Sequence, residues 1–221
     1  MIKNGGTLVL VVGPSGAGKD SIIRGAQSTF ANDAGFVFPR RIITREADIA
    51  AEDHDSIAEA AFALSVARGD YAVWWKAHGN SYGLPITIDD DLCVGRTVIF
   101  NCSRTVVGQV QTQYPKVVVA DIQVSVGQLV ERIVARGRET REEAVERASR
   151  VVPPFPAGTM AFPIRNDSSL DLAISPFCDL LRMVSDPGSH PGQRSIAKLI
   201  QNGDSHGHEA DRLHRTGVAQ R

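Results

Sequence analysis

The sequence predicts an α/β fold in which helices flank a parallel sheet. Apolar, β-branched runs without polar alternation indicate strands that are buried on both faces. They occur at 7–12, 96–101 and 116–122. Each run precedes a segment with helical spacing, at 20–27, 105–112 and 126–136. Strands that alternate with helices in this way form parallel sheets.

The other elements follow from shorter patterns. We expect a strand over 36–44, a polar loop over 47–55, a helix over 57–68, a strand over 71–76 and a turn over 78–83. A charged segment, 136–150, has helical character until prolines break it at 152–156. A last strand is expected near 162–165, and apolar residues then recur at helical spacing from Leu170 to Val184, with Pro176 interrupting them. Residues 190–221 read as a mobile tail with at most one short helix near 195–201.

The amino-acid composition excludes several classes of protein. The 221 residues suit one domain with insertions, and 43% hydrophobic and 22% charged residues exclude a disordered chain. A net charge of −1 argues against a nucleic-acid coat or a polybasic membrane surface, and no apolar run approaches the roughly 18 residues of a membrane span. Three cysteines without metal-ligand spacing favour the reducing cytosol. We therefore expect a cytoplasmic protein that binds neither nucleic acid nor membrane.

A glycine loop lies between the first strand and the first helix. Residues 13–19 fit the pattern G-x-x-x-x-G-K. Glycines allow successive backbone N–H groups to turn toward a phosphate, the helix N-terminus faces the same anion, and Lys19 adds a positive charge for the β- and γ-phosphates. The predicted ATP-binding residues are Gly13, Pro14, Ser15, Gly16, Ala17, Gly18 and Lys19.

The residue after Lys19 departs from the usual motif. Asp20 stands where Ser or Thr normally gives a hydroxyl to Mg²⁺. Asp20 can itself ligate Mg²⁺, with Ser21 as an alternative hydroxyl, or it can cap the N-terminus of the helix. The sequence leaves both interpretations open.

Further motifs, in an unbroken order from about residue 6 to 184, resemble those of the guanylate kinase family. They are the loop, Ile43-Thr44-Arg45, Glu52-Asp53-His54, the G-N-x-Y-G turn at 79–83, the arginines Arg136, Arg138 and Arg147, and Asn166-Asp167. The resemblance implies a P-loop kinase domain over 1–189, with a core at 6–40 and 94–184. It also implies an acceptor-binding insertion at 41–93 and a lid at 137–152.

The mismatches to that family concern its guanine readers. Val73 stands in place of the reading Glu, and residues 100–103, Phe-Asn-Cys-Ser, replace the acidic strand end. A lost carboxylate partner costs roughly 1–3 kcal/mol for each buried group left unpaired. The chain instead resembles a sibling group, the ribose 1,5-bisphosphate phosphokinases of phosphonate breakdown. The shared motifs are G-P-S-G-x-G-K-D, R-x-I-T-R at 41–45, E-D-H at 52–54, W-x-A-H-G-x-x-Y-G at 75–83 and N-x-S-R at 101–104.

This resemblance implies ATP-dependent, Mg²⁺-assisted phosphorylation of ribose 1,5-bisphosphate to 5-phosphoribosyl 1-diphosphate. Lys19, Arg136 and Arg147 would be catalytic. Asn166 would contact the nucleotide, and Arg138 would either contact it or stabilise the lid. Arg147 and its neighbours also fit a solvated helix of Glu–Arg pairs, which is the reading we favour for Arg141. The predicted acceptor-site residues are Arg41, Arg45, Asp53, His54, His78, Tyr82, Asn101, Ser103 and Arg104.

Several points stay open. His54 and His78 are as consistent with structural roles as with substrate contacts, and Trp74 and Trp75 favour packing over base stacking. A nucleoside monophosphate kinase with other base readers is the alternative activity. A non-catalytic binding module is a third reading, but such modules typically lack the loop lysine and lid arginines that are present here. The assembly is also open, with a homodimer as one option.

Overall fold

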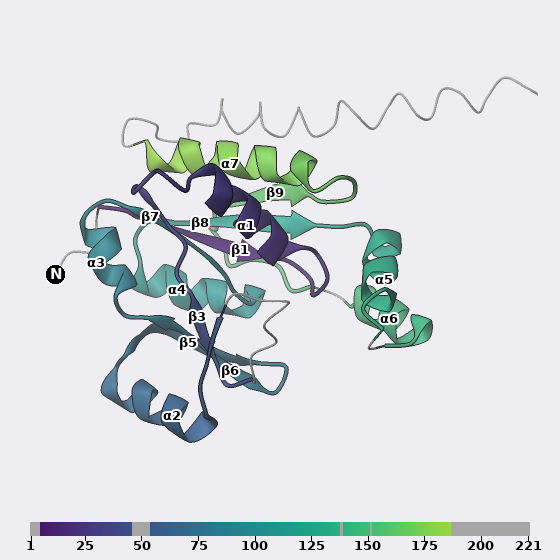
Figure 1. Ribbon diagram of the computed structural model, residues 1–221, viewed down its shortest axis with the longest axis horizontal. Coiled ribbons are helices and arrows are strands. Elements are labelled where there is room, and N and C mark those ends of the chain that lie inside the picture. The colour runs from purple at the N-terminus through teal and green to yellow at the C-terminus, as the bar shows by residue number, and fades with distance from the viewer. Residues whose placement is uncertain (1–4, 46–53, 138, 151, 187–221) are drawn as a thin grey trace, which may run out of the picture.

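The computed structural model describes residues 5–45, 54–137, 139–150 and 152–186. Its core is a five-stranded parallel sheet with the strand order β2-β7-β1-β8-β9, which confirms the predicted fold class (Figure 1). The strands are β1 (Thr7–Val12), β2 (Phe36–Val37), β7 (Thr97–Asn101), β8 (Val117–Gln123) and β9 (Ala161–Arg165). β1 lies between β7 and β8, so the loop that follows it emerges at the centre of the sheet.

Helices cover both faces of this sheet. Helices α1 (Lys19–Thr29) and α7 (Asp171–Ser185) lie side by side on one face, and the sheet packs there through Val9, Val11 and Ile122 (Figure 1). The opposite face carries α3 (Ile88–Cys93) and α4 (Val107–Gln113), which follows the short 3₁₀ turn η1 (Arg104–Val106). The sequence pattern did not predict α3.

Helix α7 runs through Pro176, so the expected interruption is wrong. A proline inside a helix removes one hydrogen bond and costs about 3 kcal/mol. Phe177, Leu180 and Leu181 nevertheless pack in the core at 0–1% exposure. Burial of each large apolar side chain contributes roughly 1.5–3 kcal/mol, so together they outweigh that cost.

A second, four-stranded sheet has the order β4-β3-β6-β5 and adjoins the α3/α4 face of the core. Its strands are β3 (Arg41–Ile43), β4 (His54–Ser56), β5 (Tyr71–Ala77) and β6 (Asn80–Pro85), and α2 (Glu59–Arg68) packs on it. This sheet occupies most of the segment expected as the insertion, 41–93. Val73, Trp75 and Leu84 join its interior to the core residues Leu92 and Phe100.

Three predicted boundaries in this region are wrong. The expected strand 36–44 consists of β2 and β3, which belong to different sheets, with Pro39 between them. The expected turn 78–83 is confined to residues 78–79, because β6 begins at Asn80 and pairs with β5. His54 lies in β4 and not in a loop, while the rest of that predicted loop falls mostly outside the described residues.

Helices α5 (Val126–Val134) and α6 (Arg141–Ala148) project from one end of the core sheet (Figure 1). The predicted helical segment 136–150 is shorter in the structure. Gly137 has a φ of 66°, and Thr140 opens α6 with a capping box that pairs it with Glu143. No helix among the described residues is long and apolar enough to span a membrane. The expected tail, 190–221, lies outside the described residues.

Candidate active site

The loop between β1 and α1 has the backbone geometry of an anion cradle. Gly13, Gly16 and Gly18 have φ values of 149°, 94° and 85°. These values favour glycine because it lacks a Cβ atom. A Cβ at Gly13 would lie 2.6 Å from the Ile122 carbonyl oxygen, and one at Gly18 would lie 2.6 Å from Nδ2 of Asn166. Both the conformation and the close neighbours therefore require glycine in this loop.

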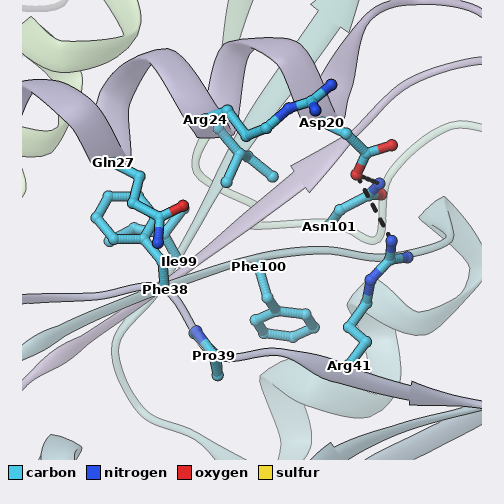
Figure 2. Close-up of a pocket in the computed structure, with 10 residues that line it drawn as sticks. Asp20, Arg24, Gln27, Phe38, Pro39, Arg41, Ile99, Phe100 and Asn101 are labelled. Carbon is cyan, nitrogen blue, oxygen red and sulfur yellow. Dashed lines mark hydrogen bonds and ion pairs between the residues drawn. The ribbon is translucent and has the colours of Figure 1, made fainter. Parts of the chain in front are cut away.

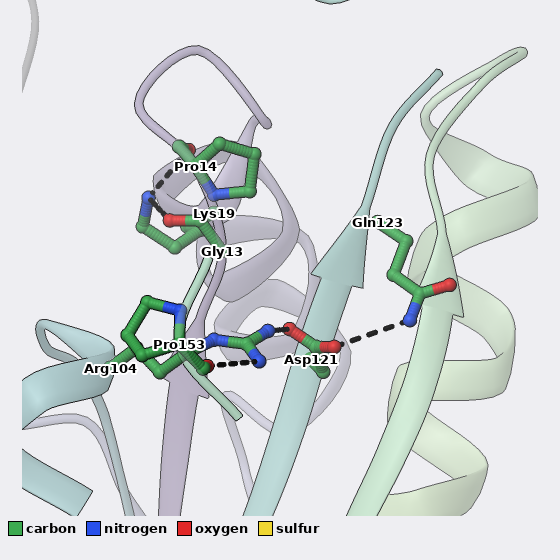
Figure 3. A network of polar contacts seen from close by, with 7 residues as sticks. All are labelled: Gly13, Pro14, Lys19, Arg104, Asp121, Gln123 and Pro153. Carbon is green, nitrogen blue, oxygen red and sulfur yellow. Dashed lines mark hydrogen bonds and ion pairs between the residues drawn. The ribbon is translucent and has the colours of Figure 1, made fainter. Parts of the chain in front are cut away.

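The lysine of the loop lies over its own backbone. Lys19 Nζ donates hydrogen bonds to the carbonyl oxygens of Gly13 at 2.8 Å and Pro14 at 2.9 Å (Figure 3). The ammonium group is thus held at the mouth of the loop. A phosphate oxygen can replace these carbonyl acceptors without a large movement of the side chain, because an ammonium group has three rotatable donors.

Asn166, which directly follows β9, supports the loop. Its side chain is 3% exposed, and Nδ2 donates to the Ala17 carbonyl oxygen at 2.7 Å. Arg132 of α5 donates to the Asn166 carbonyl oxygen at 2.7 Å, and the Asp167 carboxylate accepts from the Ser125 N–H at 2.6 Å. The Asn166-Asp167 pair therefore links the phosphate loop to the start of α5. A contact with the nucleotide by Asn166 stays a prediction.

Asp20 does not cap α1. The N-cap residue is Gly18, and Asp20 lies in the first turn, where the helix dipole favours a negative charge. The Asp20 carboxylate accepts a hydrogen bond from Asn101 Nδ2 at 2.8 Å and forms an ion pair with Arg41 at 3.5 Å (Figure 2). Asn101 ends β7, the strand beside β1. Asp20 is therefore held at the carboxyl edge of the sheet, beside the phosphate loop.

The donor set of this edge fits Mg²⁺. The described residues contain no group of three or more His, Cys, Asp or Glu side chains that could hold a metal. Magnesium in kinase sites, however, uses one or two carboxylates and takes its other ligands from water and substrate phosphates. One oriented carboxylate, Asp20, meets that requirement, and the Ser21 hydroxyl as a ligand stays a prediction.

The small sheet brings three of the predicted acceptor-site residues to one face. Arg41 of β3 lies opposite His54 of β4, and Ile43 of β3 lies opposite Tyr82 of β6. Opposed residues and alternate residues of a strand share a face, so Arg41, His54 and Tyr82 point to the same side. The Arg41 guanidinium lies 6.0 Å from the Tyr82 ring centroid, and Tyr82 stacks on Trp75 at 5.3 Å.

His54 has an unusual environment on this face. It is 4% exposed, and neither ring nitrogen has a hydrogen-bond partner among the described residues. Buried polar atoms are normally paired, so an unpaired imidazole indicates a position that a ligand or water completes. This environment favours the substrate-contact reading of His54 over the structural one.

A hydrogen-bonded bridge orients the end of β3. Thr44 and Ser81 exchange two hydrogen bonds, at 2.9 and 3.1 Å, and the Ser81 hydroxyl donates to Glu59 at 3.0 Å. The hydrogen bonds from Ser81 and Thr44 lower the pKa of Glu59. Arg45 follows this bridge directly, so the backbone that carries it is held against β6.

Three other predicted acceptor-site residues are separate from this face. His78 is exposed at the β5–β6 turn with a φ of 50°. Ser103 caps η1 by accepting a hydrogen bond from the Thr105 N–H. Arg104 pairs with Asp121 of β8 (Figure 3), and its guanidinium lies 3.9 Å from the centroid of the Phe155 ring. These contacts give Ser103 and Arg104 internal partners, and their binding of substrate stays a prediction.

The lid arginines differ in their contacts. Arg136 is exposed after α5, whereas Arg147 pairs with Glu139. Arg141 pairs with Glu131 at 2.7 Å while 61% exposed, which agrees with the solvated-pair reading of that residue. Arg138 and Asp53 lie outside the described residues. The two adjacent tryptophans differ in exposure, because Trp75 is buried and Trp74 is 40% exposed.

Sequence reasoning missed two polar residues near the loop, Asp121 and Arg132. Asp121 is 8% exposed on β8, and Arg132 reaches the Asn166 backbone from α5. A charged residue inside an otherwise apolar strand was the available signal for Asp121. Arg132 lacked such a signal, since an arginine on a helix is ordinarily a surface residue.

Comparison with known proteins supports the resemblance. No family model matches the chain. It is 45% identical over 198 residues to a bifunctional ribose 1,5-bisphosphokinase-thymidine phosphorylase of Cupriavidus pinatubonensis, covering 90% of this chain but 33% of that protein. It is 46% identical over 147 residues to a ribose 1,5-bisphosphate phosphokinase of Bradyrhizobium diazoefficiens, covering 66% of this chain and 74% of that one.

A second monofunctional relative and one solved structure complete the comparison. The ribose 1,5-bisphosphate phosphokinase of Rhodopseudomonas palustris is 45% identical over 156 residues, which cover 71% of this chain and 80% of that protein. The crystal structure of guanylate kinase from Anaplasma phagocytophilum matches with a TM-score of 0.59 at 14% identity, over 90% of this chain and 96% of that one, which indicates a shared fold. The chain spans about a third of the bifunctional relative and 74% and 80% of the two monofunctional ones. On this similarity, the chain belongs to the ribose 1,5-bisphosphate phosphokinase family.

Proposed function

We propose that the chain transfers the γ-phosphoryl group of ATP to the C1 phosphate of ribose 1,5-bisphosphate, giving 5-phosphoribosyl 1-diphosphate and ADP. The activity for which the relatives are named is one support for this proposal. The site supplies the other support, because a phosphate loop with its lysine faces a sheet that carries cationic and hydrogen-bonding side chains.

The observation that carries the choice of acceptor is the closed interior of the small sheet. Val73, which stands where guanylate kinases have their base-reading Glu, is 1% exposed. Leu84 opposite it is 0% exposed, and both pack with Trp75 and Phe100. A nucleobase would have to displace these apolar side chains and would find no polar partner on them. An acceptor without a base avoids that cost.

The proposed chemistry needs no strong general base. The acceptor oxygen belongs to a phosphate that is already ionised near neutral pH, so catalysis consists of positioning and charge neutralisation. Lys19 would hold the β- and γ-phosphates of ATP, and Arg45, His54 and Tyr82 would hold the acceptor phosphate. Asp20, oriented by Asn101, would hold Mg²⁺, which neutralises phosphate charge when bound.

We also propose that 137–152 is a lid over the loop. Its closure would bring Arg136 and Arg147 to the transferred group and exclude water. Arg147 would then exchange its partner Glu139 for phosphate oxygens. A bisubstrate analogue should protect the backbone amides of this segment from hydrogen exchange, and unchanged exchange rates would contradict closure.

The first experiment offers four acceptors side by side with ATP and Mg²⁺: ribose 1,5-bisphosphate, ribose 5-phosphate, GMP and AMP. Turnover confined to ribose 1,5-bisphosphate supports the proposal. Turnover of GMP or AMP instead would mean that the chain is a nucleoside monophosphate kinase with other base readers. Lys19→Ala should abolish turnover, whereas Lys116→Ala, an exposed lysine whose Nζ contacts the Gly5 carbonyl oxygen, is the matched control.

A further inference from the structure

A pocket lies between α1 and the segment that joins β2 to β3 (Figure 2). It holds about 470 Å³ of empty space, its open mouth included. One part of its wall is apolar and comes from Phe38, Pro39, Ile99 and Phe100, while another part is polar. The polar lining residues are Asp20, Arg24, Gln27, Arg41 and Asn101.

Two guanidinium groups line this pocket from different elements. Arg41 is 8% exposed on β3 and pairs with Asp20. Arg24 is exposed on α1, four residues after Asp20, so both side chains lie on one face of the helix. Within the described residues, no hydrogen bond or ion pair engages the Arg24 guanidinium. Among the described residues that line the pocket, two are arginines and one is a carboxylate, so this lining carries a net positive charge.

Arg41 also connects this pocket to the proposed acceptor face. Its side chain lies on the same side of the small sheet as His54 and Tyr82. A ligand with two phosphates can therefore place one of them on that face and the other in the pocket. The apolar wall suits the C–H surface of the sugar between the two phosphates, because such surfaces favour apolar contact.

We infer that this pocket binds the C5 phosphate of the acceptor, with Arg24 and Arg41 as its guanidinium ligands. Guanidinium forks match phosphate oxygens and form strong, charge-assisted hydrogen bonds. The inference rests on the proposed function and makes Arg24 a specificity-determining residue. It also gives a reason for the acceptor choice, since ribose 1-phosphate would leave the pocket empty and ribose 5-phosphate would leave the acceptor face empty.

The test pairs one substitution with one change of substrate. Arg24→Gln removes the charge from an exposed helix position, where no described contact is lost. We expect kcat/KM for ribose 1,5-bisphosphate to fall about 10- to 100-fold, as for the loss of one charge-assisted hydrogen bond. Turnover of ribose 1-phosphate, which lacks the C5 phosphate, should change less than about twofold, and so should KM for ATP.

Arg96→Gln is the control for net charge, because Arg96 precedes β7 at the opposite edge of the sheet. An unchanged kcat/KM for the bisphosphate in Arg24→Gln would overturn the inference. An equal loss with ribose 1-phosphate would also overturn it, since Arg24 would then act on the transferred group.

Calorimetric titration of ribose 5-phosphate separates this inference from the proposed function. The affinity of the wild-type chain for ribose 5-phosphate should be at least about 10-fold higher than that of Arg24→Gln. This holds whatever reaction the chain catalyses. If the wild type binds the probe in this way but does not turn over the bisphosphate, the pocket stands and the proposed function fails. Equal binding by both chains would refute the pocket.

Discussion

The contact between Asp20 and Asn101 gives the sharpest test of how the carboxyl edge is built. Asn101 Nδ2 donates to Asp20 Oδ1 at 2.8 Å, and Asn101 is 8% exposed. Asn101→Asp keeps the shape of the side chain but replaces the donor with a second carboxylate. Two like charges then face each other in a site that is partly removed from water.

The expected loss of folding stability follows from the distance between the two carboxylates. Two unit charges about 4 Å apart repel by about 4 kcal/mol at an effective dielectric constant of about 20. The lost hydrogen bond adds about 1 kcal/mol, and the nearby Arg41 guanidinium offsets part of the repulsion. We expect Asn101→Asp to lower the free energy of unfolding by about 3 kcal/mol at pH 8.

The loss should depend on pH with a defined sign. The neighbouring carboxylate raises the pKa of the introduced carboxyl in the folded chain above its unfolded value of about 3.9. The folded variant then binds more protons than the unfolded one above that pH, so its stability falls as pH rises. Near pH 4 the variant should approach the wild type.

Urea unfolding measures this directly, with the fluorescence of the buried Trp75 as probe. The matched control is the double variant Asp20→Asn/Asn101→Asp, which exchanges donor and acceptor and should recover most of the lost stability. Wild-type stability of the single variant at pH 8, or a double variant no more stable than the single one, would refute the reasoning.

Three further outcomes are expected. Gly18→Ala should lower the free energy of unfolding by at least about 2 kcal/mol and abolish ATP binding, measured by urea unfolding and calorimetry, because its φ is 85° and its Cβ would meet a buried amide. Tyr82→Phe should keep its ring stacking and raise KM for the acceptor about 10-fold without changing KM for ATP, as steady-state kinetics would show. Alkylation followed by mass spectrometry should modify Cys93 in the folded chain but not the buried Cys102 and Cys178, since burial raises the pKa of Cys102 to about 12 and also raises that of Cys178.

The sequence predicted the core sheet well because its signals are local. An apolar strand, a glycine loop and a helix follow one another within residues 7–29, and the register of β1 between β7 and β8 agrees with that pattern. The small sheet was predicted less well, except for β5, because two of its strands are only three residues long. Strands of three residues, such as β3 and β4, carry no measurable periodicity, and their pairing is decided by contacts far along the chain.

The sequence predicted which residues belong to the site, but not how they are arranged in space. Motif order brought Arg41, His54 and Tyr82 into one list, and strand register brings them to one face. Arg24 belonged to no motif, because its position in the pocket depends on how α1 packs against the segment before β3. Such a residue becomes visible only when the tertiary structure is known.

The two departures from the common phosphate-loop pattern are one structural feature. P-loop enzymes commonly hold Mg²⁺ with a hydroxyl on the loop helix and a carboxylate at the end of a neighbouring strand. Here the helix carries Asp20 and the end of β7, next to β1, carries Asn101. A carboxylate and a neutral side chain thus stand in exchanged places, while a second carboxylate, Asp121, lies on β8 at the other side of β1. Because the amide donates to the carboxylate, the exchange also fixes the orientation of Asp20. From the sequence alone, Asp20 could be either a cap or a ligand. In the structure Gly18 is the N-cap, and the partner that orients the Asp20 carboxylate lies 81 residues away.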